Sequence, residues 1–151
     1  MSDYSKKRDF SKTPEPQWSI AKSHESIFVV QEHHASHLHW DFRLALDGVL
    51  KSWAIPKEPP VESGVKRLAI QTEDHPLEYA NFEGVIPEGQ YGAGVVKIWD
   101  KGTFELLERT DKKYDFILNG NKLKGRYHLI KFPKGGDNAW LFFKSDQYVA
   151  I

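Results

Sequence analysis

The sequence predicts an all-β fold, a small closed antiparallel β-barrel of about eight strands with a polar groove and an N-terminal arm. Short segments alternate apolar and polar residues with a period of two, which is typical of strands that bury one face. Turn-forming Gly, Asn and Asp separate these segments at regular intervals, and no stretch has a clear helical period. We expect closure into a barrel because it removes the exposed edges of a small antiparallel sheet.

The overall composition excludes several classes of protein. The 21 basic and 21 acidic residues cancel, so binding to nucleic acid would depend on a local patch. The absence of cysteine rules out disulfides, thiolate metal sites and a cysteine nucleophile. No apolar run approaches the ~18 residues of a membrane span, and the N-terminus has no signal-peptide core. We therefore expect a soluble, cytoplasmic protein with no membrane partner, and its size favours a monomer.

We expect one domain over residues 1–151, with an N-terminal arm at 1–26 and the barrel at 27–151. The arm is polar and has no strand or helix period. Its aromatic residues Tyr4, Phe10 and Trp18 favour an arm that packs along the domain.

The hairpin around Asp47-Gly48 is written most clearly into the sequence. An Asp-Gly pair suits a two-residue turn, because both central residues need positive φ. One predicted face is apolar, and the other presents His39, Asp41 and Arg43 in a row above small neighbours. The predicted register pairs Leu46 with Val49, Arg43 with Ser52, Phe42 with Trp53 and Asp41 with Ala54.

The other strands are bounded by turn residues. A first strand is predicted at 27–32, a connection at 34–37, and a further strand at 66–72. Residues 73–94 are rich in Gly, Pro and charge and predict a loop of ~20 residues, a length that often serves function. The remaining predictions are strands 95–99 and 103–107 flanking an Asp100-Lys101-Gly102 turn, strands 114–118 and 122–132 flanking an Asn119-Gly120 turn, and a last strand at 139–144.

A histidine cluster predicts a metal site. Four of the seven histidines fall between Glu32 and His39, and an aspartate follows on the polar strand face. Two histidines and one carboxylate form a three-ligand set for Mn²⁺, Fe²⁺ or Zn²⁺ that leaves positions open for water and substrate. His33, His37 and His39 all compete to join Asp41.

Arg43 follows Asp41 on the same face and could hold a phosphate or carboxylate by two hydrogen bonds. Lys57, Arg67 and His75 lie in segments that could flank the hairpin. Together with a metal, they would form the anion clamp that phosphoryl chemistry needs. His75 could act as a general acid, and Tyr79 could bind the same anion or fill the core.

The strings FVVQEHHASHLHWDFRLALDGVLKSWAIPKEP and VKRLAIQTEDHPLEYANFEGVIPEGQYGAG closely resemble the 3′-phosphoesterase domain of bacterial DNA ligase D and its free-standing archaeal homologues. The resemblance implies a small β-barrel enzyme that depends on Mn²⁺ and heals DNA 3′ ends in non-homologous end joining. Such an enzyme removes a 3′-terminal ribonucleoside to leave a 3′-phosphate, and then removes that phosphate to expose a 3′-hydroxyl. Its partners would be primer-template 3′ ends and a separate polymerase and ligase acting in trans.

The resemblance also implies a role for individual positions. It places the metal ligands at His33, His39 and Asp41, which decides against His37; Co²⁺ or Zn²⁺ could occupy the same ligands as Mn²⁺. It places the phosphate-binding and catalytic positions at Arg43, His75, Gln31, Lys57, Arg67 and Tyr79, and in the arm at Arg8, Asp9 and Glu15.

Two other functions fit parts of the pattern. A cupin-like metal oxygenase also uses two histidines and a carboxylate on a β-barrel, but it usually adds a later histidine, for which His128 is the only candidate. A non-catalytic single-strand-binding barrel would use Trp40, Trp53 or Trp99 as exposed stacking platforms, and the alternation places Trp40 and Trp53 on the apolar face instead.

Overall fold

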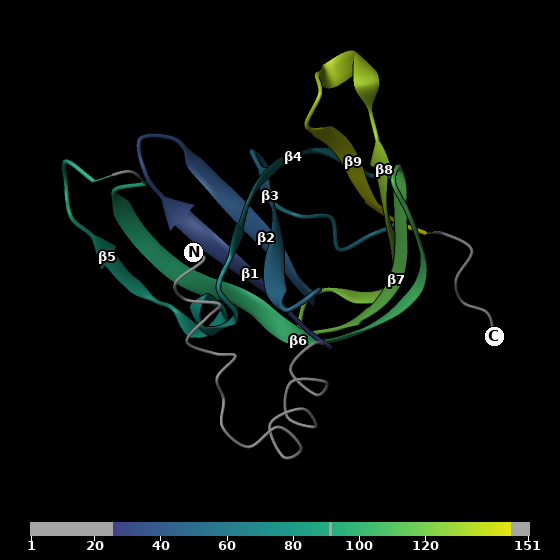
Figure 1. The fold of residues 1–151 in the computed structure, drawn as a ribbon, viewed down its shortest axis with the longest axis horizontal. Coiled ribbons are helices and arrows are strands. Elements are labelled where there is room, and N and C mark those ends of the chain that lie inside the picture. The colour runs from purple at the N-terminus through teal and green to yellow at the C-terminus, as the bar shows by residue number, and fades with distance from the viewer. Residues whose placement is uncertain (1–25, 91, 146–151) are drawn as a thin grey trace.

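The computed structural model describes residues 26–90 and 92–145, and these form a closed antiparallel barrel, as predicted (Figure 1). The strands follow the order β1-β2-β3-β4-β9-β8-β7-β6, and pairing of β1 with β6 closes the ring. β5 adds to the edge of β6 outside the ring. The strands are β1 (Ile27–His34), β2 (Leu38–Leu46), β3 (Val49–Ile55), β4 (Lys66–His75), β5 (Gly84–Ile86), β6 (Gly94–Thr110), β7 (Lys113–Asn119), β8 (Lys124–Lys131) and β9 (Ala139–Lys144).

The described part of the chain has no α-helix. It has two short 3₁₀ helices, η1 (Leu77–Asn81) and η2 (Pro133–Gly135). Neither is long and apolar enough to cross a membrane.

The Asp47-Gly48 hairpin is confirmed in both turn and register. Asp47 has φ 58° and Gly48 has φ 79°, the positive values that a two-residue hairpin turn requires. β2 and β3 pair as predicted, including Phe42 with Trp53 and Arg43 with Ser52. The side-chain faces therefore also follow the prediction, because slipping the register by one residue would exchange them.

The barrel interior is an aromatic core around Phe42, which is fully buried. Its ring centroid lies 4.7 Å from that of Phe142, 5.9 Å from Phe116 and 6.2 Å from Trp53. A smaller apolar cluster lies on the outer face of the same strands. There Val29, Ala45 and Leu50 pack against Ala80 of η1, which anchors the 73–94 segment over β1, β2 and β3.

The predicted turn at Asp100-Lys101-Gly102 is wrong. These residues lie inside β6, a continuous strand of 17 residues that pairs with β1 and then with β7. Gly102 allows the backbones of β6 and β7 to approach closely at Asn119, because a Cβ at position 102 would overlap the Asn119 carbonyl. The Asp100 carboxylate is buried and accepts the backbone N–H groups of 121–123.

The hairpin after β7 is confirmed, but its predicted two-residue turn is wrong. Asn119 pairs with Lys124, so residues 120–123 form the connection, and neither Asn119 nor Gly120 has positive φ. The Asp100 carboxylate of β6 accepts the backbone N–H groups of this connection. Such a contact from a neighbouring strand cannot be predicted from the local sequence.

The 73–94 segment has more structure than predicted. β4 continues to His75, and η1 and β5 follow. Short elements of this kind depend on packing against the barrel, so alternation and turn residues alone do not reveal them.

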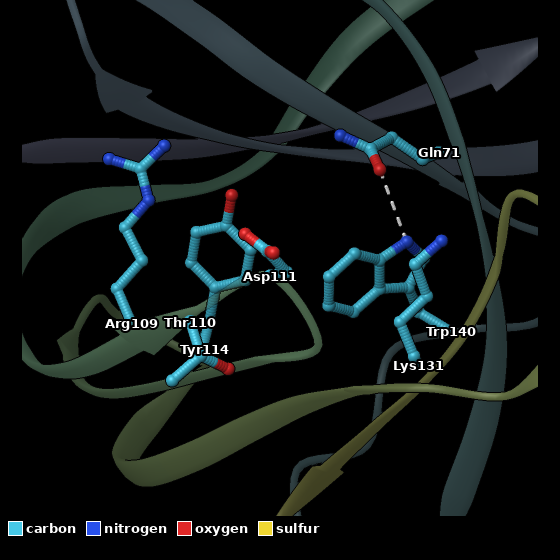
Figure 2. A pocket seen from close by; sticks show the side chains of 7 residues that line it. All are labelled: Gln71, Arg109, Thr110, Asp111, Tyr114, Lys131 and Trp140. Atoms are coloured by element: carbon cyan, nitrogen blue, oxygen red, sulfur yellow. Dashed lines mark hydrogen bonds between the residues drawn. The ribbon is translucent and has the colours of Figure 1, made fainter.

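One end of the barrel is hollowed where β6 turns into β7 and β8 leads to β9 (Figure 2). The cavity there measures about 480 Å³ and lies against the core residues Tyr114 and Trp140.

Candidate active site

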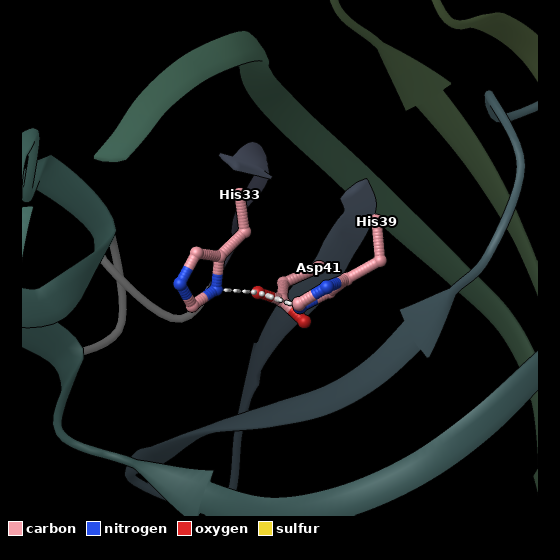
Figure 3. A group of neighbouring side chains, drawn as sticks. All are labelled: His33, His39 and Asp41. Carbon is pink, nitrogen blue, oxygen red and sulfur yellow. Dashed lines mark ion pairs between the residues drawn. The ribbon is translucent and has the colours of Figure 1, made fainter. Parts of the chain in front are cut away.

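His33, His39 and Asp41 come together on the outer face of the barrel (Figure 3). His33 of β1 lies directly opposite His39 of β2, and Gln31 lies opposite Asp41. Nδ1 of His33 is 3.5 Å from Oδ2 of Asp41, and Nε2 of His39 is 3.4 Å from the same oxygen. One donor atom from each residue lies within 4.8 Å of the other two, a spacing that suits a single metal ion.

Backbone carbonyls hold both imidazoles in the orientation that a metal ligand needs. His33 Nε2 lies 2.7 Å from the Gly92 carbonyl, and His39 Nδ1 lies 3.1 Å from the His37 carbonyl. Because a carbonyl only accepts, each of these nitrogens carries the proton in the neutral ring. The lone pairs of His33 Nδ1 and His39 Nε2 then face the Asp41 carboxylate, a donor set that needs a cation at its centre.

The electrostatics keep the Asp41 carboxyl ionised. Burial would raise its pKa, but hydrogen bonds that His33 and His39 donate in their protonated form, together with the charge of Arg43, hold that pKa well below its usual range. The hydrogen bond to Asp41 raises the pKa of His39 against the opposing effect of burial. Asp41 is therefore a carboxylate at neutral pH, the form that binds a metal ion.

Arg43 is 4% exposed, and its guanidinium is held on two sides. Nε donates to Gln31 Oε1 at 2.6 Å, and Nη1 donates to Ser52 Oγ at 2.8 Å. Nη2 lies 3.5 Å from Asp41 Oδ2, beside the metal ligands. These contacts use the Nε and Nη1 side of the fork and leave N–H groups of Nη2 for an incoming anion.

His75 adjoins the same guanidinium. Its Nδ1 lies 3.1 Å from Arg43 Nη1 and 3.0 Å from the Glu73 carbonyl. A guanidinium only donates and a carbonyl only accepts, so Nδ1 serves one of them at a time. Burial, followed by the charge of Arg43, lowers the pKa of His75 and favours the neutral ring that accepts from Arg43.

The η1 segment covers this cluster. Tyr79 of η1 lies against Arg43, and Gln31 of β1 binds the backbone of the covering segment. The Tyr79 ring centroid is 4.9 Å from Arg43 Cζ and 4.9 Å from the His75 ring. The Gln31 side chain is fully buried and donates from Nε2 to the carbonyls of Tyr79 at 2.8 Å and Phe82 at 3.2 Å. One amide therefore holds both the arginine and the segment above it.

Two predicted residues lie apart from this cluster. Lys57 is exposed beyond the end of β3, and Arg67 lies opposite the core residue Phe142 on the interior face of β4. Arg67 Nε donates to the Glu58 carbonyl at 2.8 Å. The arm positions Arg8, Asp9 and Glu15 lie outside the described residues.

Two contacts in the site were not predicted from the sequence. Ser52 was expected to leave room beside Arg43, whereas its hydroxyl binds the guanidinium. The correct register already placed a hydroxyl opposite Arg43 and could have indicated this bond. The Gly92 carbonyl that orients His33 gave no signal, because its position depends on the fold of the 73–94 segment.

The described histidines outside this cluster take other positions. His37 is exposed in the β1–β2 connection and contributes only its carbonyl to the site. His128 lies on β8 with Nδ1 3.3 Å from Asp115, and it does not join the three metal-type ligands.

Comparison with known proteins gives a family match over most of the chain. Residues 31–131 match the family model described as DNA Ligase D 3′-phosphoesterase domain. The multifunctional non-homologous end joining protein LigD of Pseudomonas aeruginosa is 48% identical over 154 residues, which cover 96% of this chain and 18% of that protein. The corresponding DNA repair protein of Mycobacterium tuberculosis H37Rv is 51% identical over 148 residues, covering 93% of this chain and 19% of that protein. This chain thus spans about a fifth of the length of these relatives.

Proposed function

Because the chain belongs to the DNA ligase D 3′-phosphoesterase family, we propose that it is a metal-dependent phosphoesterase that heals DNA 3′ ends in non-homologous end joining. The proposed reactions remove a 3′-terminal ribonucleoside to leave a 3′-phosphate, and then remove that phosphate to leave a 3′-hydroxyl. The observation that supports this best is the convergence of His33, His39 and Asp41 beside the guanidinium of Arg43. The metal ion and the guanidinium would neutralise the negative charge of a phosphoryl group bound there from two sides.

We propose Mn²⁺ as the cofactor, held by His33 Nδ1, His39 Nε2 and a carboxylate oxygen of Asp41. Two imidazoles and one carboxylate suit Mn²⁺, and would also accept Co²⁺ or Zn²⁺. The fixed tautomers of both histidines support this ligand set, because their free lone pairs face the carboxylate. A divalent cation bound there supplies Lewis-acid charge to a phosphoryl oxygen.

Arg43 is proposed to bind the phosphate through Nη2. Its Nε and Nη1 are already bound to Gln31, Ser52 and His75, so the guanidinium is oriented before substrate arrives. A preorganised donor of this kind stabilises the charge that develops on phosphoryl oxygens without reorganising during the reaction. We assign Gln31 and Ser52 as positioning residues, because their polar atoms contact Arg43.

His75 is proposed to contact the phosphate by donating a hydrogen bond from Nε2 to a phosphoryl oxygen. With Nδ1 accepting from Arg43, the neutral ring keeps its proton on Nε2. The Tyr79 ring lies against both groups on one side of the clamp. Lys57, Arg67, Arg8, Asp9 and Glu15 stay candidate contacts to the rest of the DNA.

The two rival functions lack supporting geometry. The oxygenase reading needs a later histidine ligand, and His128 pairs with Asp115 on β7 instead of joining the triad. The single-strand-binding reading needs exposed aromatic rings, but Trp40 and Trp53 are 9% and 0% exposed. Lys122 covers the ring of Trp99, with Nζ 4.8 Å from its centroid.

The proposal is tested on a primer-template whose 3′ end carries one ribonucleotide, incubated with protein and Mn²⁺. We expect stepwise conversion to a 3′-phosphate and then a 3′-hydroxyl. EDTA and His39→Ala should abolish both steps. His37→Ala is the matched control, because this exposed histidine orients His39 through a backbone carbonyl that the substitution retains.

Mn²⁺ binding is measured separately by electron paramagnetic resonance. We expect His39→Ala to weaken binding and His37→Ala to leave it unchanged. An intact primer with folded, Mn²⁺-loaded wild-type protein would refute the proposed function. Equal loss of Mn²⁺ binding in both variants would refute the ligand assignment. We further propose that a polymerase and a ligase of end joining act with this chain.

A further inference from the structure

The hollow end of the barrel has the features of a second binding site. Its cavity of about 480 Å³ lies within the range of small-molecule sites. Tyr114 and Trp140 of the core border it and are 6% and 3% exposed. Buried aromatic side chains of the barrel core therefore border the cavity on one side, and the exposed residues Arg109, Thr110 and Asp111 border it as well.

Hydrogen-bond donors surround this cavity from three strands. Gln71 Oε1 accepts from Trp140 Nε1 at 3.1 Å, so the Gln71 NH₂ group has to point elsewhere. Figure 2 shows this NH₂ group, the Tyr114 hydroxyl and the Arg109 guanidinium around the same space. All three could bind an acceptor placed between them.

The two cations beside the cavity are anchored but keep unused N–H groups. Lys131 Nζ donates to the Asp137 carbonyl at 2.9 Å and lies 5.5 Å from the Trp140 ring centroid. Arg109 binds Asp47 through Nη1 at 3.0 Å and Nη2 at 2.7 Å and also donates to Tyr114, which uses three of its five N–H groups. Both positive groups are thus held in place with donors to spare for an anion.

The cavity also offers acceptors. Asp111 contributes a carboxylate from the β6–β7 turn, and Thr110 at the end of β6 contributes a hydroxyl, which also accepts from the Lys112 backbone N–H at 3.1 Å. A ligand that fits this lining has an anionic group for the cations and the amide, and hydrogen-bond donors on a flat body for the carboxylate. Inorganic phosphate lacks the flat body, and an uncharged aromatic lacks the anion.

From this lining we propose that the barrel-end cavity binds a nucleoside monophosphate unit, either as a free nucleotide or as part of a nucleic acid strand. Lys131 and Gln71 hold the phosphate, Arg109 borders the same space, and Asp111 accepts from the exocyclic amino group of the base. Both sources present the same chemistry, and the experiment below separates them.

This site is separate from the candidate active site. Asp47, which anchors Arg109, directly follows the last residue of β2, whereas His39 lies near the beginning of that strand. At about 3.3 Å per residue, the separation along the strand is roughly 25 Å. The inference does not rest on the proposed phosphoesterase activity, and either can fail without the other.

The test titrates the ¹⁵N-labelled full chain, in EDTA and without added metal, with dGMP, dAMP, dCMP and dTMP. We expect saturable shifts of the Trp140 indole and Gln71 amide signals, assigned with Trp140→Phe and Gln71→Glu. Lys131→Met should weaken dGMP binding about tenfold, because it removes a charge-assisted hydrogen bond and retains the stem over Trp140. Lys124→Met, at the exposed opposite end of β8, is the matched control and should change nothing.

Further arms separate the alternatives. Asp111→Asn should weaken dGMP and dCMP and spare dTMP, which has no exocyclic amino group. His39→Ala should bind dGMP like wild type. A single-stranded oligonucleotide that moves the same signals at lower concentration identifies a nucleic acid strand as the source, whereas shifts by mononucleotides alone identify a free nucleotide. Equal shifts with inorganic phosphate, or unchanged dGMP affinity in Lys131→Met, would overturn the proposal.

Discussion

Replacing Arg43 by lysine tests whether the shape of the guanidinium, and not only its charge, organises the candidate site. Arg43 bonds Gln31 through Nε and both Ser52 and His75 through Nη1, while Nη2 faces Asp41. A lysine ammonium keeps the charge but is a single point with three N–H groups, and it cannot reach these partners at once.

The cost follows from what the lysine leaves unpaired. Gln31 and Ser52 are both fully buried, so an unsatisfied oxygen on either one costs about 1–3 kcal/mol. If the ammonium keeps one partner and loses the other, Arg43→Lys lowers the free energy of unfolding by about 1–3 kcal/mol. A domain with about 5–15 kcal/mol of stability stays folded after that loss. Loss of a preorganised donor to the phosphoryl oxygens should lower kcat by about 10²- to 10³-fold.

Urea denaturation gives the stability change, and single-turnover cleavage of a 3′-phosphate primer gives the activity. Lys51→Arg serves as the control for an arginine–lysine exchange on the neighbouring strand, where the side chain is partly exposed and only pairs with Asp74 and Asp47. Arg43→Lys with wild-type stability and wild-type turnover would show that the guanidinium geometry has no such role.

Three more predictions concern other features of the fold. Burial would raise the pKa of Asp115, but the hydrogen bond from Arg126 and the charges of His128, Arg126 and Lys113 together outweigh it and lower the pKa, so the stabilisation is present above about pH 4 and is lost as pH falls through the folded-state pKa. The stability gap between wild type and Asp115→Asn in urea melts should therefore shrink as pH falls below about 4, and a constant gap would contradict this. Gly102→Ala should lower the free energy of unfolding by about 1–3 kcal/mol, because its Cβ would overlap the Asn119 carbonyl, whereas a residue in a free turn would tolerate alanine. Gly92→Ala should weaken Mn²⁺ binding in paramagnetic resonance titrations, because alanine is strained at φ 77° and the carbonyl that orients a metal-ligand histidine would shift; unchanged Mn²⁺ affinity would refute that role.

The sequence predicted those parts of the structure that depend on neighbours along the chain. The Asp47-Gly48 turn fixed the register of β2 and β3, and alternation then assigned Asp41 and Arg43 to the polar face. Barrel closure also followed, because strand number and turn spacing together favour it.

The errors arose where distant residues replace a local signal. Asp100 and Gly102 are typical turn residues, yet both lie inside β6. There the Asp100 carboxylate binds the backbone of the β7–β8 connection, and Gly102 allows the close approach of Asn119. In the same way, the Gln31 contacts to η1 depend on a segment almost fifty residues away. The resemblance to a known family named Gln31 as functional, but only the structure shows what its side chain contacts.

The Gln31 amide has a consequence for how the site responds to binding. Its Nε2 faces two backbone carbonyls of the covering segment, so Oε1 can only point toward Arg43. The planar amide therefore ties the direction of the guanidinium to the position of the main chain above it. If a DNA end binds as proposed and draws Arg43 toward its phosphate, it also pulls on the η1 segment through the same bond, and a shift of that segment changes how Arg43 is held. The contact that Arg43 makes with a bound phosphate and the position of the η1 segment are therefore coupled through Gln31.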